Sequence, residues 1–138
     1  MITTRSMSTP PVSLDAEVRD IMTPGVVSIP SDASMRRVHE TMLAHGLHAV
    51  LVVDRETGQP IGWVTARGLL RWAGRVGTVR TAKQAISEPV HTVSPSAPVR
   101  DAVAMLLSAE VSHLLVGGAA MPEGVVADID IVRIDSHR

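Results

Sequence analysis

The chain contains no cysteine, no phenylalanine and no tyrosine, so its two tryptophans, Trp63 and Trp72, are the only large aromatic side chains. The absence of cysteine excludes disulfides, thiolate zinc sites and cysteine nucleophiles, and it is typical of a reducing compartment. With so few rings, the chain offers no stacking platform for single-stranded nucleic acid. Its net charge of −1 gives no field that would recruit nucleic acid or an anionic membrane.

Long hydrophobic runs are also absent. Glycine aside, the longest apolar run is residues 102–107, whereas a membrane-spanning helix needs about 20 apolar residues. The N-terminus lacks the apolar stretch of a secretory signal, and Met7 is an alternative start to Met1. We therefore expect a soluble, cytoplasmic protein that has neither membrane nor nucleic acid among its partners.

An internal repeat organises the 138 residues. The segment IPSDASMR at 29–36 matches VSPSAPVR at 93–100, a shift of 64 positions, and GWV at 62–64 matches GVV at 124–126, a shift of 62. Two such units form a tandem pair with a shared core and no solenoid. The sequence predicts a flexible tail at 1–14, a first repeat at 15–74, a linker at 75–81 and a second repeat at 82–138.

Each repeat has the pattern of a β-α-β-β-α unit. In the first, we expect a short strand at 26–29, followed by a helix whose apolar residues recur at helical spacing. The consecutive apolar residues 49–53 predict a strand covered on both faces. A polar turn at 54–60 separates it from a strand at 61–65, which leads into a second helix.

The ends of the first helix of each repeat can also be predicted. Asp32 and Ser96 stand at equivalent positions and are favourable N-cap residues. Pro98 falls in the first turn, where its missing N–H is harmless. Gly46 is expected to end the first helix, and a short lead-in helix is expected at 18–22.

Several short motifs resemble the signature of the cystathionine β-synthase (CBS) domain. They are VRDIMTP at 18–24, LVVD at 51–54, GWVT at 62–65, VSHLLV at 111–116 and GVVADID at 124–130. The resemblance covers about 120 residues and implies an α/β fold, in which two CBS repeats pack about a pseudo-two-fold axis and leave two clefts. Such modules commonly form homodimers, bind AMP, ADP, ATP, S-adenosylmethionine or NAD, and act as sensors.

In this family the ligand motif is Gly-hydrophobic-hydrophobic-Ser/Thr-x-x-Asp, and neither copy here is complete. The first has Thr65 but Gly68 in place of the carboxylate, and the second has Asp130 but Ala127 in place of the hydroxyl. A carboxylate at a strand-to-helix turn can accept two hydrogen bonds from a ribose diol. The helix that begins there directs N–H groups at a phosphate.

The resemblance implies that each cleft takes its ribose-binding end from one repeat and its adenine contacts from the other. The better cleft would be formed by Asp130, Asp128, Ala127, Thr23, Val27, Leu47, His48 and Ala49. The weaker cleft would be formed by Thr65, Arg67, Ser87, His91, Val111, Ser112 and His113. Arg67 could hold a phosphate, whereas the charge of Asp128 favours adenosine-like or weakly charged ligands in the better cleft.

Other interpretations of these residues stay open. Asp130 could simply cap the last helix, and Thr65 could be an ordinary strand-end residue. The basic residues between positions 67 and 83 form either a solvated face or an anion-binding or partner-binding patch. Of six histidines, His45 and His48 have helical spacing but are separated by Gly46, and a closed zinc site needs four convergent ligands. We therefore predict no metal.

The sequence predicts a stand-alone regulatory module that is not an enzyme. It lacks a Gly-x-Ser-x-Gly elbow, a Walker loop and a Gly-x-Gly-x-x-Gly loop. We expect a homodimer that senses an adenosine nucleotide or S-adenosylmethionine, requires no cofactor and signals to a separate, unknown partner protein. The alternative is a ligand-free module for dimerisation or protein interaction, whose nucleotide motifs are degraded at Gly68 and Ala127.

Overall fold

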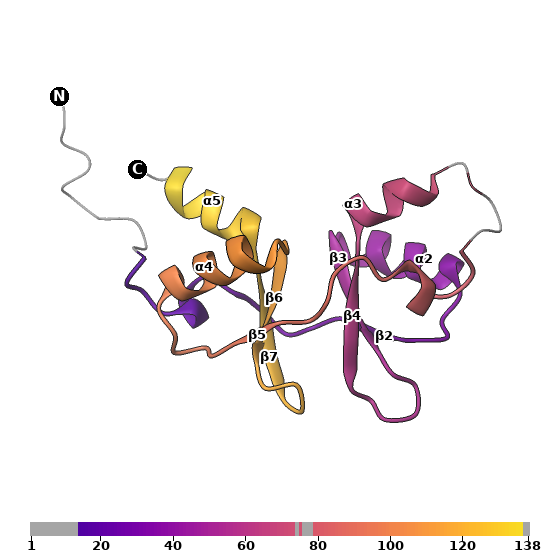
Figure 1. The fold of residues 1–138 in the computed structure, drawn as a ribbon, viewed down its shortest axis with the longest axis horizontal. Coiled ribbons are helices and arrows are strands. Elements are labelled where there is room, and N and C mark those ends of the chain that lie inside the picture. Colours follow the sequence, from indigo (N-terminus) through magenta and orange to yellow (C-terminus); the bar gives the residue numbers. More distant parts are fainter. Residues whose placement is uncertain (1–13, 74, 76–78, 137–138) are drawn as a thin grey trace. The chain divides into compact units, whose positions relative to one another are not determined.

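The computed structural model describes residues 14–73, 75 and 79–136 (Figure 1). The chain divides into two compact units, and each is described by itself. Unit 1 contains the chain up to Gly25 and again from His91 onward, and unit 2 contains Val26–Val90. All of the predicted tail except Leu14 lies outside the described residues, as does part of the predicted linker.

Unit 2 is built on a three-stranded sheet. Its strands have the order β2-β3-β4, with β2 parallel and β4 antiparallel to β3. The elements are β2 (Ser28–Pro30), α2 (Met35–His45), β3 (Ala49–Val53), β4 (Pro60–Thr65), α3 (Ala66–Leu69) and the 3-10 turns η2 (Leu70–Trp72) and η3 (Lys83–Ala85). The predicted strand at 49–53 is confirmed, and the next strand begins one residue earlier than predicted.

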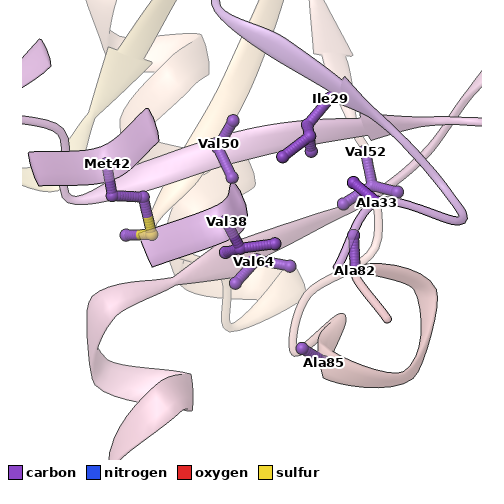
Figure 2. Packing of buried hydrophobic residues seen from close by; sticks show 9 residues of the cluster. All are labelled: Ile29, Ala33, Val38, Met42, Val50, Val52, Val64, Ala82 and Ala85. Carbon is purple, nitrogen blue, oxygen red and sulfur yellow. The ribbon is translucent and has the colours of Figure 1, made fainter. Parts of the chain in front are cut away.

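The core of unit 2 lies between α2 and one face of this sheet (Figure 2). Val38 and Met42, which are one turn apart on α2, pack with the alternating strand residues Val50 and Val52. The residues of this cluster are Ile29, Ala33, Val38, Met42, Val50, Val52, Val64, Ala82 and Ala85. Because the last two come from the beginning of the predicted second repeat, that segment is part of the core of unit 2.

Unit 1 contains a four-stranded sheet with the order β1-β7-β6-β5. Its elements are η1 (Val18–Asp20), β1 (Thr23–Pro24), β5 (Thr92–Val93), α4 (Val99–Ala109), β6 (His113–Gly117), β7 (Pro122–Ala127) and α5 (Asp128–Ser136). Val18 of the lead-in turn is completely buried in the core with Leu114 of β6 and Val126 of β7. The lead-in turn is therefore part of the core of unit 1.

The first segment of each predicted repeat packs against the other repeat. The Val18 N–H donates to the Ala97 carbonyl at 2.8 Å, next to the start of α4, and the Ala82 N–H donates to the Ala33 carbonyl at 2.9 Å, next to the start of α2. The compact units consequently exchange these segments relative to the sequence repeats. The repeat boundaries at 15–74 and 82–138 stay a prediction from sequence.

The predicted N-caps are wrong by two residues in each repeat. Helix α2 is capped by Ser34, whose hydroxyl accepts the Arg37 N–H at 3.2 Å, and α4 begins after Pro98 without a side-chain cap. Asp32 instead forms an ion pair with Arg55 of the β3–β4 hairpin. In the first repeat the prediction failed because Asp and Ser are equally good N-cap residues, and a non-local partner binds the aspartate.

Left-handed backbone ends both long helices. Gly46 has φ of 62°, as predicted for this position, and the aligned Glu110 has φ of 55°. In the β3–β4 hairpin, the Asp54 carboxylate accepts the N–H groups of Thr57 and Glu56, each at 2.9 Å. These hydrogen bonds hold the pKa of Asp54 below its ordinary value of 3.8.

Candidate functional site

The turn from β7 into α5 holds Asp130. One carboxylate oxygen, Oδ2, accepts the Ala127 N–H at 2.8 Å, and the residue is only 9% exposed. This is the returning half of a capping box, in which an acidic residue in the first turn satisfies the backbone N–H of the N-cap residue. The other oxygen, Oδ1, lies 3.6 Å from the exposed Arg133 guanidinium. Because a carboxylate has about four acceptor positions, this arrangement leaves Oδ1 capable of further hydrogen bonds.

The corresponding turn from β4 into α3 holds Thr65. Its Oγ1 accepts the Gly68 N–H at 2.9 Å and lies 2.9 Å from the Ser87 hydroxyl. Thr65 is 4% exposed. A hydroxyl has one donor and two acceptor positions, so the protein already uses most of the hydrogen-bonding capacity of this buried group.

The two turns retain complementary halves of one capping box. In the first copy the hydroxyl is present and the acidic residue is replaced by Gly68, and in the second the acidic residue is present and the hydroxyl is replaced by Ala127. A Ser/Thr-x-x-Asp turn therefore has a structural role whether or not a ligand binds. The interpretation of Asp130 as a capping residue is correct, although the residue acts from the first turn and not as the N-cap.

Backbone hydrogen bonds place further predicted residues beside each turn. In unit 2 the Ala66 N–H donates to the His48 carbonyl at 2.7 Å, and Ala49 pairs with Thr65 across the sheet. In unit 1 the Asp128 N–H donates to the Ser112 carbonyl at 3.0 Å. Each turn therefore lies next to the segment of its own copy that was predicted to contact adenine.

The predicted site residues are divided between the two units. Unit 1 contains Thr23, His91, Val111, Ser112, His113, Ala127, Asp128 and Asp130. Unit 2 contains Val27, Leu47, His48, Ala49, Thr65, Arg67 and Ser87. That residues of both units contact one ligand stays a prediction.

Several of these residues have structural roles as well. The His91 carbonyl accepts the Leu115 N–H at 2.9 Å, and the Val27 carbonyl accepts the Leu51 N–H at 3.2 Å. Ser112 Oγ lies 2.8 Å from Nδ1 of His113. Sequence reasoning missed Arg133, although its position three residues after Asp130 on a helix places the two side chains on one face.

Neither a metal centre nor a membrane span can be assigned within the described ranges. Among the residues that the structure describes, no group of three or more histidine, aspartate and glutamate side chains is arranged to hold a metal ion. In the same part of the chain, every helix is too short or too polar to cross a bilayer.

Comparison with known proteins identifies the family. The CBS domain model matches residues 18–75 and 82–137. The chain belongs to the CBS domain family. Among curated relatives, protein MJ1404 of Methanocaldococcus jannaschii is 28% identical over 121 residues, which make up 86% of this chain and 28% of that protein. The CBS pair therefore spans less than a third of the length of this relative.

Solved CBS-domain structures share the fold. The CBS domain pair of protein MJ0100, in complex with 5′-methylthioadenosine and S-adenosyl-L-methionine, matches with a TM-score of 0.75 and 20% identity, covering 88% of this chain and 96% of that one. CBSX2 in complex with AMP matches with a TM-score of 0.70 and 20% identity over the same shares. These likenesses support the CBS fold predicted from the sequence.

Proposed function

We propose that this CBS pair senses an adenosine-containing ligand, whose ribose hydroxyls donate hydrogen bonds to Asp130 at the β7–α5 turn. The observation that carries the proposal is the arrangement of the Asp130 carboxylate. The Ala127 N–H orients it through Oδ2, while Oδ1 lies 3.6 Å from Arg133, beyond hydrogen-bond distance. Relatives of the same fold that hold AMP, or S-adenosylmethionine and 5′-methylthioadenosine, support the ligand class.

Charges around the turn favour a ligand with little negative charge. Asp128 and Asp130 both lie in the first turn of α5. Their carboxylates oppose the positive end of the helix dipole, which would otherwise attract phosphate. Arg133 is the nearby cation and is exposed. We therefore expect adenosine, AMP or S-adenosylmethionine to bind better than ATP.

Thermal stability of the purified chain tests the proposal against AMP, ADP, ATP, adenosine, NAD and S-adenosylmethionine. A ligand at a hundred times its dissociation constant stabilises the folded state by about 2.7 kcal/mol, which raises Tm by several degrees. We expect Asp130→Ala to lose this ligand-induced rise. Because the substitution also removes a capping bond, each variant is compared with its own unliganded Tm.

The matched control for this experiment is Asp101→Ala. Asp101 is another acidic residue in the first turn of a helix, α4, but it is exposed and lies outside the predicted site. This variant should keep the ligand-induced rise in full. If no compound raises the Tm of the wild type, the proposal is wrong and the alternative, a ligand-free interaction module, is favoured.

We also propose that the chain forms a homodimer through α2 and α4 and signals to a separate partner protein. Leu43 on α2 and Leu107 on α4 occupy aligned positions in the repeat and are 83% and 74% exposed. Burial of such side chains in an interface is favourable. Light scattering should give the mass of a dimer for the wild type and of a monomer for Leu43→Lys/Leu107→Lys. An unchanged mass in the double variant would contradict this interface.

A ligand acts on the partner protein only if it binds two arrangements of the dimer with unequal affinity.

A further inference from the structure

Gly68 in the first strand-to-helix turn is in contact with the side chain of Ser87. A Cβ atom on Gly68 would lie 2.4 Å from Ser87 Oγ and 2.5 Å from Ser87 Cβ. Both distances are well below van der Waals contact, which is about 3.5–4.0 Å for carbon atoms. Position 68 aligns with Asp130 of the second copy. The side chain of Ser87 therefore fills the space in which a carboxylate at position 68 would begin.

Ser87 is fixed in this place by its neighbours on both sides. Its N–H donates to the Trp63 carbonyl, and the Trp63 N–H donates to the Glu88 carbonyl, each at 2.9 Å. The preceding Ile86 lies against Gly62 of β4, where a Cβ atom would be 2.4 Å from Ile86 Cγ2. The segment 86–88 thus runs along β4 as an antiparallel bridge, and Ser87 cannot move without breaking that bridge.

The hydroxyl of Ser87 also hydrogen-bonds with Thr65, the remaining polar side chain of the turn. It lies 2.9 Å from Thr65 Oγ1, which already accepts the Gly68 N–H. The first turn consequently presents no carboxylate to a ligand, and two of the three hydrogen-bonding positions of Thr65 Oγ1 are already used. In unit 1 the residue that aligns with Ser87 is Thr23, which pairs through β1 with Val125, and position 130 keeps its carboxylate.

We infer that Ser87 closes the first turn to ribose, so that the chain has a single adenosine site, the one at Asp130. Gly68 and Ser87 are then a pair of specificity-determining residues, because the lack of a side chain at position 68 makes room for the side chain of Ser87. The count of one site rests on the proposed function. The closure by Ser87 rests only on the contacts within unit 2.

The steric part is tested by thermal unfolding without ligand. Gly68→Ala should lower Tm by several degrees, and Ser87→Gly introduced into the same chain should recover more than half of that loss, measured against Ser87→Gly alone. Ser87→Ala is the matched control and should recover little, because its Cβ remains 2.5 Å from the new methyl group. Equal effects of Gly68→Ala with and without Ser87→Gly would overturn the inference.

The binding part uses isothermal titration with AMP and, separately, with S-adenosylmethionine. We expect one ligand per chain in the wild type and two in Gly68→Asp/Ser87→Gly, which restores the carboxylate and removes the serine side chain. Two ligands per wild-type chain would overturn the inference. If the wild type binds neither probe and the double variant binds one ligand per chain, the proposed site at Asp130 is wrong but closure by Ser87 is upheld. If neither protein binds, both proposals fail.

Discussion

Gly124→Ala is expected to lower the free energy of unfolding by about 3 kcal/mol, the upper end of the range for an overpacked interior. A Cβ atom at this position would lie 2.5 Å from the Thr23 carbonyl oxygen and 2.8 Å from Met22 Sδ. The carbonyl belongs to β1, which pairs with β7 at this point. The backbone of β1 therefore cannot move away without losing its pairing with β7. Urea denaturation measures the loss, and hydrogen exchange should show reduced protection at 22–25.

The aligned Gly62 gives a matched comparison. The three atoms nearest to its Cβ would all be side-chain atoms of Ile86, at 2.4–3.1 Å, and all of them lie beyond Cβ of the isoleucine. Gly62→Ala should therefore add little destabilisation in a chain that already carries Ile86→Ala. Met22→Ala should not rescue Gly124→Ala, because the backbone oxygen of Thr23 stays in place. Rescue by Met22→Ala would show that the contact with backbone is not what excludes a side chain.

Leu114→Ala should cost about 2–5 kcal/mol of stability, the range for a large-to-small change in a packed core. Leu114 lies on β6, a central strand of unit 1, is completely buried, and packs with Val18, Leu106 and Val126. The substitution removes apolar contact area and leaves a cavity among residues from four elements. The midpoint of chemical denaturation reports the change.

Met121→Ala serves as the control for this loss. Methionine and leucine have similar volumes, but Met121 lies between β6 and β7 and is 79% exposed. A surface change of this kind usually alters stability by no more than about 0.5 kcal/mol. Equal losses in the two variants would mean that the core of unit 1 is not packed around Leu114.

Local patterns in the sequence predicted those features that depend on neighbouring residues. The consecutive apolar residues of β3 and the left-handed end of α2 at Gly46 are both decided within a few positions. The internal repeat and the CBS signature predicted the fold class for the same reason, since each motif is short and occurs in order. The N-cap failed at Asp32 because Arg55, a residue of a distant hairpin, forms an ion pair with it.

The candidate site was predictable in composition but not in its contacts. Sequence identified Thr65 and Asp130 as the remaining members of two incomplete motifs. It did not reveal that Ser87 fills the space beside Gly68, because that contact depends on how the segment 86–88 runs along β4. Hydrogen bonds between residues far apart in sequence bring Ser87 close to Gly68, and the sequence of the turn itself gives no sign of them.

The exchange of lead-in segments has a consequence for synthesis of the chain. All residues of unit 2 are contiguous, so they are synthesised one after another without interruption. In unit 1, by contrast, β1 pairs with β7, which is synthesised about a hundred residues later. Closing so long a loop costs only slightly more entropy than closing a shorter one. During translation, however, Thr23 and Pro24 stay without their native strand partner until β7 has been made. Unit 2 can therefore fold before the second segment of unit 1, which begins at His91, has been synthesised.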